Sequence, residues 1–300
     1  MSYSAGVKNE LFNLPNKSKN ENIAELLGVF MAKNSIKENG IILSTENIAL
    51  AKRVYSNIKK ATDLEIQIKY LTSKRLGVHK VYEVIIPYQK GYIEFLKSMF
   101  DFKNLDSSLD ESVFKGLIKG YFLSCGYIKS PEKGYALDFF IDTEDAATFL
   151  YYLFKKIGKK VFQADKKNKN LVYIRNSEDI LDVLIIMSAV GTFFKYEETI
   201  INKEIRNKVN RNMNWEIANE TRKITTAEKQ IKMIEEIEQL AGLNTLTDAL
   251  KGVAKMRIEN PDLSLQELAD LMNISKSGIR NRFRRLAEFY NEMTNKENEE

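Results

Sequence analysis

Cysteine and histidine are almost absent from this sequence of 300 residues, which contains one of each, Cys125 and His79. A single cysteine excludes an internal disulfide and a cysteine-rich zinc site. A single histidine, with no nucleophile near it in the sequence, provides little for acid–base or nucleophilic catalysis. The sequence therefore predicts no catalytic residue, no metal site and no cofactor.

Proline is also scarce, at four residues, and no run of eighteen apolar residues occurs. Few prolines indicate that most of the chain forms regular structure. The lack of a long apolar run argues against a membrane span, and the early charge in MSYSAGVKNELF argues against a signal peptide. These absences predict a cytoplasmic protein. The net charge of +5 is small, so the distribution of charge is more informative than its sum.

Two stretches of the chain, 21–105 and 110–196, repeat one predicted order of elements: helix, strand, helix, strand, strand, helix. The predicted strands are IILST, LEIQIKYL and VYEVIIP in the first stretch and ALDFFID, KKVFQAD and NLVYIRN in the second. Alternating apolar residues indicate strands, and apolar residues at helical spacing indicate helices. The matched order predicts an internal duplication and an α+β fold with antiparallel sheets.

One helical phrase occurs in both stretches, as LLGVFMAKNSI from Leu26 and LIKGYFLSCGYI from Leu117. Each copy contains a glycine, Gly28 or Gly120, although glycine inside a helix costs about 1 kcal/mol. Glycine is tolerated where a second backbone comes close. We therefore expect two central helices that cross at these glycines. The alternative is a pair of buried amphipathic helices with chance glycines.

Both phrases resemble degenerate copies of the LAGLIDADG helix of homing endonucleases. In that family the paired helices lie between two sheets that form a saddle over DNA, and an acidic residue at the foot of each helix binds the catalytic metal. Lys33 and Cys125 stand at those positions here. A lysine repels a divalent cation, and a thiol is a poor ligand for Mg²⁺. Glu25, Glu38 and Asp110 lie a helical turn or more away. The resemblance therefore implies a DNA-binding fold without nuclease activity.

The stretch DLSLQELADLMNISKSGIRNRFRRL predicts a helix-turn-helix. Ser264 followed by Glu267 forms a capping box at the start of the first helix. Asn273 lies in the turn, where asparagine tolerates the left-handed conformation, and Ser275 is expected to cap the second helix.

The second helix of this motif is expected to read DNA, because Ile279, Phe283 and Leu286 form a buried stripe and no acidic residue occurs over 276–285. Arginine can read guanine and asparagine can read adenine, while flanking arginines suit phosphates. The alternative is a solvated basic helix in an ordinary bundle. The predicted DNA contacts in this domain are Ser264, Ser275, Lys276, Ser277, Arg280, Asn281, Arg282, Arg284 and Arg285.

A polar stretch without proline or glycine, 197–238, connects the two parts and is predicted to be helical. Its first half is rich in arginine and asparagine, and Arg211 and Asn214 are candidate DNA contacts. A solvated spacer is the alternative. The expected domains are 1–196 for the duplicated part, 197–238 for the connector, 239–290 for the helix-turn-helix and 291–300 for a disordered tail.

Nearly the whole chain resembles the WhiA family. The segments that carry the resemblance are MSYSAGVKNEL at the start, SPEKGYALDF, NRNMNWEIAN and KSGIRNRFRRL. The resemblance implies a transcription regulator that binds double-stranded DNA, acts in sporulation, cell division or chromosome segregation, and has lost nuclease activity. Implied partners are another transcription regulator or RNA polymerase, and the implied location is the nucleoid.

Two other functions stay open on the sequence alone: an active metal-dependent endonuclease, and a protein-interaction module. The internal duplication already supplies twofold symmetry, so we expect that the protein can act as a monomer. Basic residues on or beside predicted strands are candidate DNA contacts of the saddle. They are Lys69, Lys129, Lys133, Lys166, Lys167 and Arg175.

Overall fold

A computed structural model of the chain describes residues 2–73, 79–103, 110–166 and 168–297. The chain divides into two compact units, Met1–Glu204 and Ile205–Glu300. No helix among the described residues is both long enough and apolar enough to cross a membrane.

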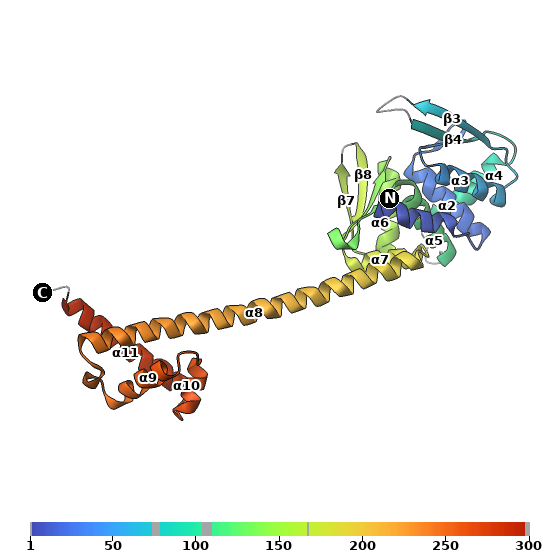
Figure 1. Cartoon of the computed structure of the whole chain (residues 1–300). Coiled ribbons are helices and arrows are strands. Elements are labelled where there is room, and N and C mark those ends of the chain that lie inside the picture. The colour runs from blue at the N-terminus through green and yellow to red at the C-terminus, as the bar shows by residue number, and fades with distance from the viewer. Residues whose placement is uncertain (1, 74–78, 104–109, 167, 298–300) are drawn as a thin grey trace. The chain divides into compact units, whose positions relative to one another are not determined.

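The first unit opens with one helix and the first copy of the duplicated arrangement (Figure 1). The elements are α1 Tyr3–Asn13, α2 Lys19–Ala32, β1 Ile36–Lys37, β2 Gly40–Thr45, α3 Ile48–Ala61, β3 Gln67–Ser73, β4 His79–Pro87, α4 Tyr92–Phe100 and the 3₁₀ turn η1 Asp101–Lys103.

The second copy follows the same order, as the sequence predicts. Its elements are α5 Glu111–Cys125, β5 Gly126–Ile128, the 3₁₀ turn η2 Pro131–Lys133, β6 Leu137–Ile141, α6 Glu144–Lys156, β7 Val161–Lys166, β8 Lys169–Ile174 and α7 Ser177–Ile186. The sheets have matching antiparallel orders, β1-β2-β4-β3 and β5-β6-β8-β7. The α+β class with flanking antiparallel sheets is confirmed. The sequence missed β1 and β5, which are too short to show an alternating pattern.

Helices α2 and α5 cross at the predicted glycines. A Cβ atom added to Gly28 would lie 2.4 Å from the carbonyl oxygen of Leu117 and 3.2 Å from the Cα of Gly120. The sequence missed a third small residue of this contact, Gly116, whose added Cβ would lie 2.6 Å from the carbonyl oxygen of Glu21. Backbone approaches this short exclude a side chain at any of these positions. The doubled phrase therefore exists because its two copies pack on each other.

A buried set of charged side chains also links the two central helices. The Lys119 ammonium donates to Glu21 at 2.7 Å, and the Arg53 guanidinium donates twice to Glu25, at 2.5 and 2.8 Å. Asn16 donates to Glu25 at 2.9 Å and accepts from Lys119 at 2.7 Å. Every carboxylate in this set has a cation partner, which buried charges require.

Helix α8, Val190–Leu240, begins in the first unit and ends in the second. The predicted boundaries at 196 and 238 both fall inside it. The second unit also contains the 3₁₀ turn η3 Leu243–Thr245 and the helices α9 Asp248–Glu259, α10 Leu265–Leu271 and α11 Lys276–Glu297 (Figure 1).

The core of the second unit includes Ile234 and Ile237 from α8, together with Val253, Leu268 and Ile279. The tail predicted for 291–300 is helical as far as Glu297, because no glycine or proline follows the core contacts of Phe289 and Tyr290. Residues 298–300 lie outside the described residues.

Candidate nucleic-acid interface

Helices α10 and α11 form the predicted helix-turn-helix. The Ser264 hydroxyl accepts the Glu267 N–H at 3.2 Å, and the Glu267 carboxylate accepts the Ser264 N–H at 2.7 Å. This reciprocal pair is the predicted capping box and determines where α10 begins. Asn273 has φ of 52°, the left-handed conformation that the turn requires. The local geometry expected from the sequence is confirmed.

The start of α11 is held in the same way. The Ser275 hydroxyl accepts the Gly278 N–H at 3.1 Å and lies 2.9 Å from the Ser277 hydroxyl. Ser264 and Ser275 thus have structural roles as caps, and their contact with DNA stays a prediction.

Helix α11 has one buried face and one basic face. Ile279, Phe283 and Leu286 are buried in the core of the second unit, as predicted. The predicted DNA contacts lie on the remaining surface, with Arg282 half-buried. The exposed members are Lys276, Ser277, Arg280, Asn281, Arg284 and Arg285. Burial of the apolar stripe thus determines which side of α11 is available to a ligand.

The charges on this face are almost uncompensated. Arg284 forms an ion pair with Glu288 at 3.3 Å, and both side chains are well exposed, so the pair is weak. Among the described residues, the other four cations of 276–285 form no ion pair. The result is a basic surface presented by a helix of fixed orientation, which suits a nucleic-acid backbone.

Arg257, on α9, is a buried residue that the sequence pattern did not reveal. Its guanidinium donates to the carbonyl oxygens of Leu263, Asn260 and Pro261 at 2.6, 3.3 and 3.3 Å, and to the Gln230 side chain at 3.0 Å. Burial lowers its pKa. The loop that leads into the Ser264 cap is therefore held by one side chain.

The connector residues predicted to contact DNA lie on α8. Arg211 and Asn214 are exposed, and the Arg211 Nε donates to the carbonyl oxygen of Asn207 at 3.2 Å. Side chains three apart share one face of a helix, so Arg211 and Asn214 can act together. Trp215, on the same stretch of α8, is 67% exposed, so it does not serve as a packing anchor.

The feet of the central helices carry Lys33, the C-cap of α2, and Cys125, the last residue of α5. Burial raises the pKa of the Cys125 thiol to about 11, although the positive charges of Lys33 and Lys8 act to lower it. Burial lowers the pKa of the Lys8 ammonium, on α1, to about 8. A protonated thiol between two lysines is a poor setting for a divalent metal. The sequence did not reveal Lys8 as a neighbour.

Two of the three carboxylates nearest these feet in the sequence, Glu25 and Asp110, have other partners. Glu25 accepts from Arg53 and Asn57. Asp110 caps the opposite end of α5, where its carboxylate accepts the Ser112 N–H at 3.2 Å. Among the described residues, no group of three or more histidine, cysteine, aspartate or glutamate side chains could hold a metal ion.

Two of the basic residues predicted on the saddle lie beside acidic residues of their sheets. The Arg175 guanidinium is 2.6 Å from the Asp138 carboxylate and 4.4 Å from the ring centroid of Tyr173. Lys69 lies directly across the sheet from Glu83. The ion pair with Asp138 partly neutralises the Arg175 charge. Lys167 lies outside the described residues.

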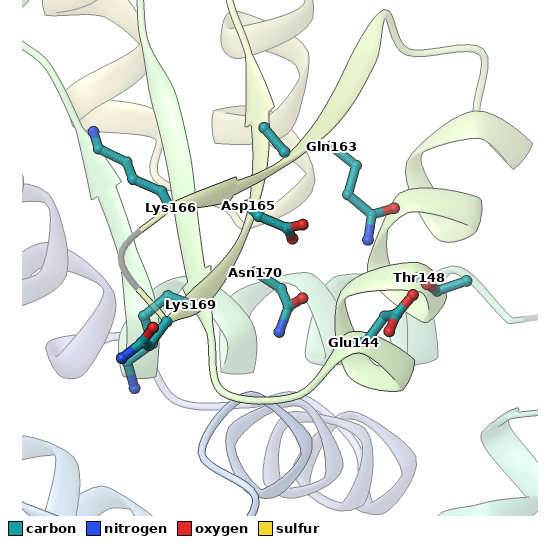
Figure 2. Close-up of a pocket in the computed structure, with 9 residues that line it drawn as sticks. Glu144, Thr148, Gln163, Asp165, Lys166, Lys169 and Asn170 are labelled. Atoms are coloured by element: carbon teal, nitrogen blue, oxygen red, sulfur yellow. The ribbon is translucent and has the colours of Figure 1, made fainter.

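A polar cleft of about 770 Å³ lies between α6 and the β7–β8 hairpin. Figure 2 shows the side chains of Glu144 and Thr148 on one side of it and those of Gln163, Asp165 and Asn170 on the other. No sequence pattern indicates this cleft, although the elements that form its walls follow one another in the chain.

Known proteins resemble this chain over its full length. A protein of Clostridium acetobutylicum named "Probable cell division protein WhiA" is 33% identical and aligns with 98% of each chain. The chain belongs to the WhiA family. A second WhiA protein with the same name, from Clostridium botulinum, is 31% identical and aligns over 98% of this chain and 99% of its own.

Family models of WhiA also match in order. The WhiA N-terminal LAGLIDADG-like domain matches residues 19–99, the WhiA LAGLIDADG-like domain matches 114–206, and the WhiA C-terminal HTH domain matches 209–290. The last match includes Arg211 and Asn214, so most of the predicted connector, from residue 209 onward, falls within the helix-turn-helix domain of this family.

A solved structure supports the same fold. Full-length DUF199/WhiA from Thermatoga maritima superposes with a TM-score of 0.62 and 24% identity, covering 98% of this chain and 99% of that one.

Proposed function

We propose that this WhiA protein is a sequence-specific DNA-binding regulator that acts in cell division, chromosome segregation or sporulation and does not cut DNA. The observation that carries the proposal is the basic face of α11, which is exposed, almost free of acidic neighbours and mounted on a capped helix-turn-helix. The role in cell division follows the name given to the Clostridium relatives.

In this proposal α11 enters the major groove of double-stranded DNA. Arg280 and Asn281 are exposed on its first turns and can hydrogen-bond to base edges. Arg284 and Arg285 follow one turn later and suit phosphates. Ser275, Lys276 and Ser277 lie at the N-terminal end of α11, and Ser264 lies at the N-terminal end of α10, where the helix dipole also favours a phosphate. Arg282 and the connector residues Arg211 and Asn214 would add contacts to the backbone.

The test is a salt titration of DNA affinity with Arg280→Ala and Arg284→Ala, using sites selected from random duplexes. We expect each substitution to weaken binding by about 1–3 kcal/mol if it removes a base contact. Loss of a phosphate contact should instead reduce the slope of log K against log salt by about 1. Lys232→Ala removes the same charge from an exposed site on α8 and serves as the control. If both arginine variants bind DNA as tightly as the parent protein, the assignment of Arg280 and Arg284 as DNA contacts is wrong.

Nuclease activity is the competing proposal, and the feet of the central helices argue against it. Hydrolysis of DNA by Mg²⁺ requires carboxylates that hold the ion, whereas Lys33 and Cys125 stand there. Purified protein incubated with supercoiled plasmid and Mg²⁺ or Mn²⁺ should leave the plasmid intact. If plasmid nicking copurifies with the protein and disappears in Lys33→Ala, the proposal that the protein does not cut DNA is wrong.

We further propose that the first unit contacts a protein, such as another transcription regulator or RNA polymerase, and that the protein is cytoplasmic and bound to the nucleoid. The pairing of Arg175 with Asp138 supports a protein partner, because a sheet that reads DNA needs available cations. Genome-wide mapping of bound sites with Arg280→Ala as the control would test nucleoid binding and identify the regulated genes.

A further inference from the structure

Helix α8 carries an exposed apolar stripe in the second unit. Ile205, Val209, Met213 and Ile217 recur every four residues and are 56%, 50%, 52% and 60% exposed. Side chains four apart lie one above another on one face of a helix. Neither hydrophobic core of the described structure includes any of the four. Single exposed apolar residues are ordinary, but a continuous row of four marks a contact surface.

The spacing of the stripe indicates what kind of partner fits it. Residues four apart form a ridge on a helix, and two such ridges interlock when the helices cross at about −50°. A stripe of this length therefore fits another helix that carries the same ridge.

The charged residues on this face change sign along the helix. At about 100° per residue, Arg206, Glu216 and Glu220 fall within the arc of the stripe. Arg206 lies in its first half, and the two glutamates lie at its end. Lys223 pairs with Glu220 at 3.2 Å within the helix, which leaves Glu216 as the acidic counterpart of Arg206.

This polarity favours a second copy of the same helix in the antiparallel direction. With a twofold axis midway between Val209 and Met213, Val209 of each copy faces Met213 of the other copy. The same axis brings Arg206 of each copy close to Glu216 of the other. A parallel arrangement would set Arg206 against Arg206, and such like-charge contacts disfavour an interface.

We propose that the stripe Ile205–Ile217 is a self-association surface on which a second copy of this chain packs antiparallel. Arg211 and Asn214 lie on the other side of the helix. Self-association therefore does not cover these proposed DNA contacts. The internal twofold symmetry of the first unit means that this unit does not need a second copy of the chain. The stripe belongs to the second unit, so that symmetry does not replace the proposed contact.

Sedimentation equilibrium of the full chain without DNA tests the proposal, so its outcome does not depend on the proposed function. We expect a reversible monomer–dimer equilibrium. Met213→Glu should weaken the dimer about tenfold or more, because the twofold axis places both new carboxylates in the contact. The control is Trp215→Glu, since Trp215 is 67% exposed but lies on another side of the helix. It should leave the dissociation constant unchanged.

Charge reversal provides the second, independent readout. Arg206→Glu and Glu216→Arg should each weaken the dimer, and the double variant should restore it, because the reversed charges again face opposite partners. Restoration would also show that the loss in the single variants comes from their charges and not from misfolding. The proposal is overturned if the parent sediments as a monomer at every concentration, if Met213→Glu and Trp215→Glu have equal effects, or if the double variant is weaker than both single variants.

Discussion

A Cβ atom on Gly120 would lie 2.2 Å from the carbonyl oxygen of Glu25, a distance that real Cβ atoms do not reach. This contact and the matching contact at Gly28 bring the backbones of α2 and α5 together at the centre of the first unit. The carbonyl belongs to a residue whose own side chain is bound by Arg53. The same short segment therefore sets the distance between the helices and holds a buried charge.

Gly120→Ala should destabilise the first unit by about 3 kcal/mol or more, because the colliding atom is backbone and cannot rotate away. Urea unfolding followed by circular dichroism measures this change. Gly6→Ala is the matched control, since Gly6 lies in α1 with no atom within 4 Å of an added Cβ. That substitution should stabilise the protein by up to about 1 kcal/mol. Equal effects of the two substitutions would contradict the close crossing.

The ionised Glu21 carboxylate should stabilise the fold in a pH-dependent way. Burial acts to raise its pKa, but hydrogen bonds from Lys119 and the Lys17 N–H and the charges of Lys119 and Lys115 lower it overall. Because the pKa of Glu21 in the folded state is below the unfolded-state value of about 4.3, the ionised carboxylate stabilises the fold at pH values above about 4.3. The stabilisation is lost as the pH falls through the lowered folded pKa.

Glu21→Gln should therefore lower the stability at neutral pH and make it less sensitive to acid. Urea midpoints measured between neutral pH and the acid limit provide the comparison. Glu198→Gln changes an exposed glutamate of the same unit and is the control. An acid dependence as steep in Glu21→Gln as in the parent would mean that this carboxylate is not the source.

Arg257→Lys should destabilise the second unit by about 3 kcal/mol, because a lysine cannot supply the forked donors that bond to three carbonyl oxygens of the loop. DNA affinity should also fall, since the loop that Arg257 holds leads into the cap of α10. Lys255→Ala, at an exposed position of the same helix, should change neither property. Thermal unfolding and DNA titration on the same samples test both parts, and retention of full stability in Arg257→Lys would contradict them.

The Cys125 thiol should be unreactive in the folded protein. It is buried, and burial raises its pKa to about 11, whereas the thiolate is the form that reacts. Iodoacetamide at neutral pH should label the native chain far more slowly than the urea-unfolded chain. The pKa of Cys125 is higher in the folded state than in the unfolded state. The protonated thiol therefore contributes to the stability of the fold below the ordinary cysteine pKa, and this contribution is lost as the pH rises through about 11. Rapid labelling of the native chain would show that the foot of α5 is open to solvent.

The sequence by itself determined the features that depend on local patterns. Alternating and helical spacing predicted the duplicated order of elements, and Ser264, Glu267 and Asn273 predicted the helix-turn-helix, because caps and turns are formed by residues close together in the chain. The crossing of Gly28 and Gly120 was also predictable, because a glycine destabilises a helix unless a second backbone must come close to it. The exposed side of α11 followed from its apolar stripe.

Only the tertiary structure decided which polar residues are buried together. Lys119 and Glu21 are 98 positions apart, and Arg257 bonds to Gln230 across 27 positions, so no local spacing predicts either contact. The exposed stripe of α8 was also hidden in the sequence, where a helical row of apolar residues normally indicates a core. Burial is a property of the folded packing, and the pattern shows which residues share a face but not whether anything covers that face.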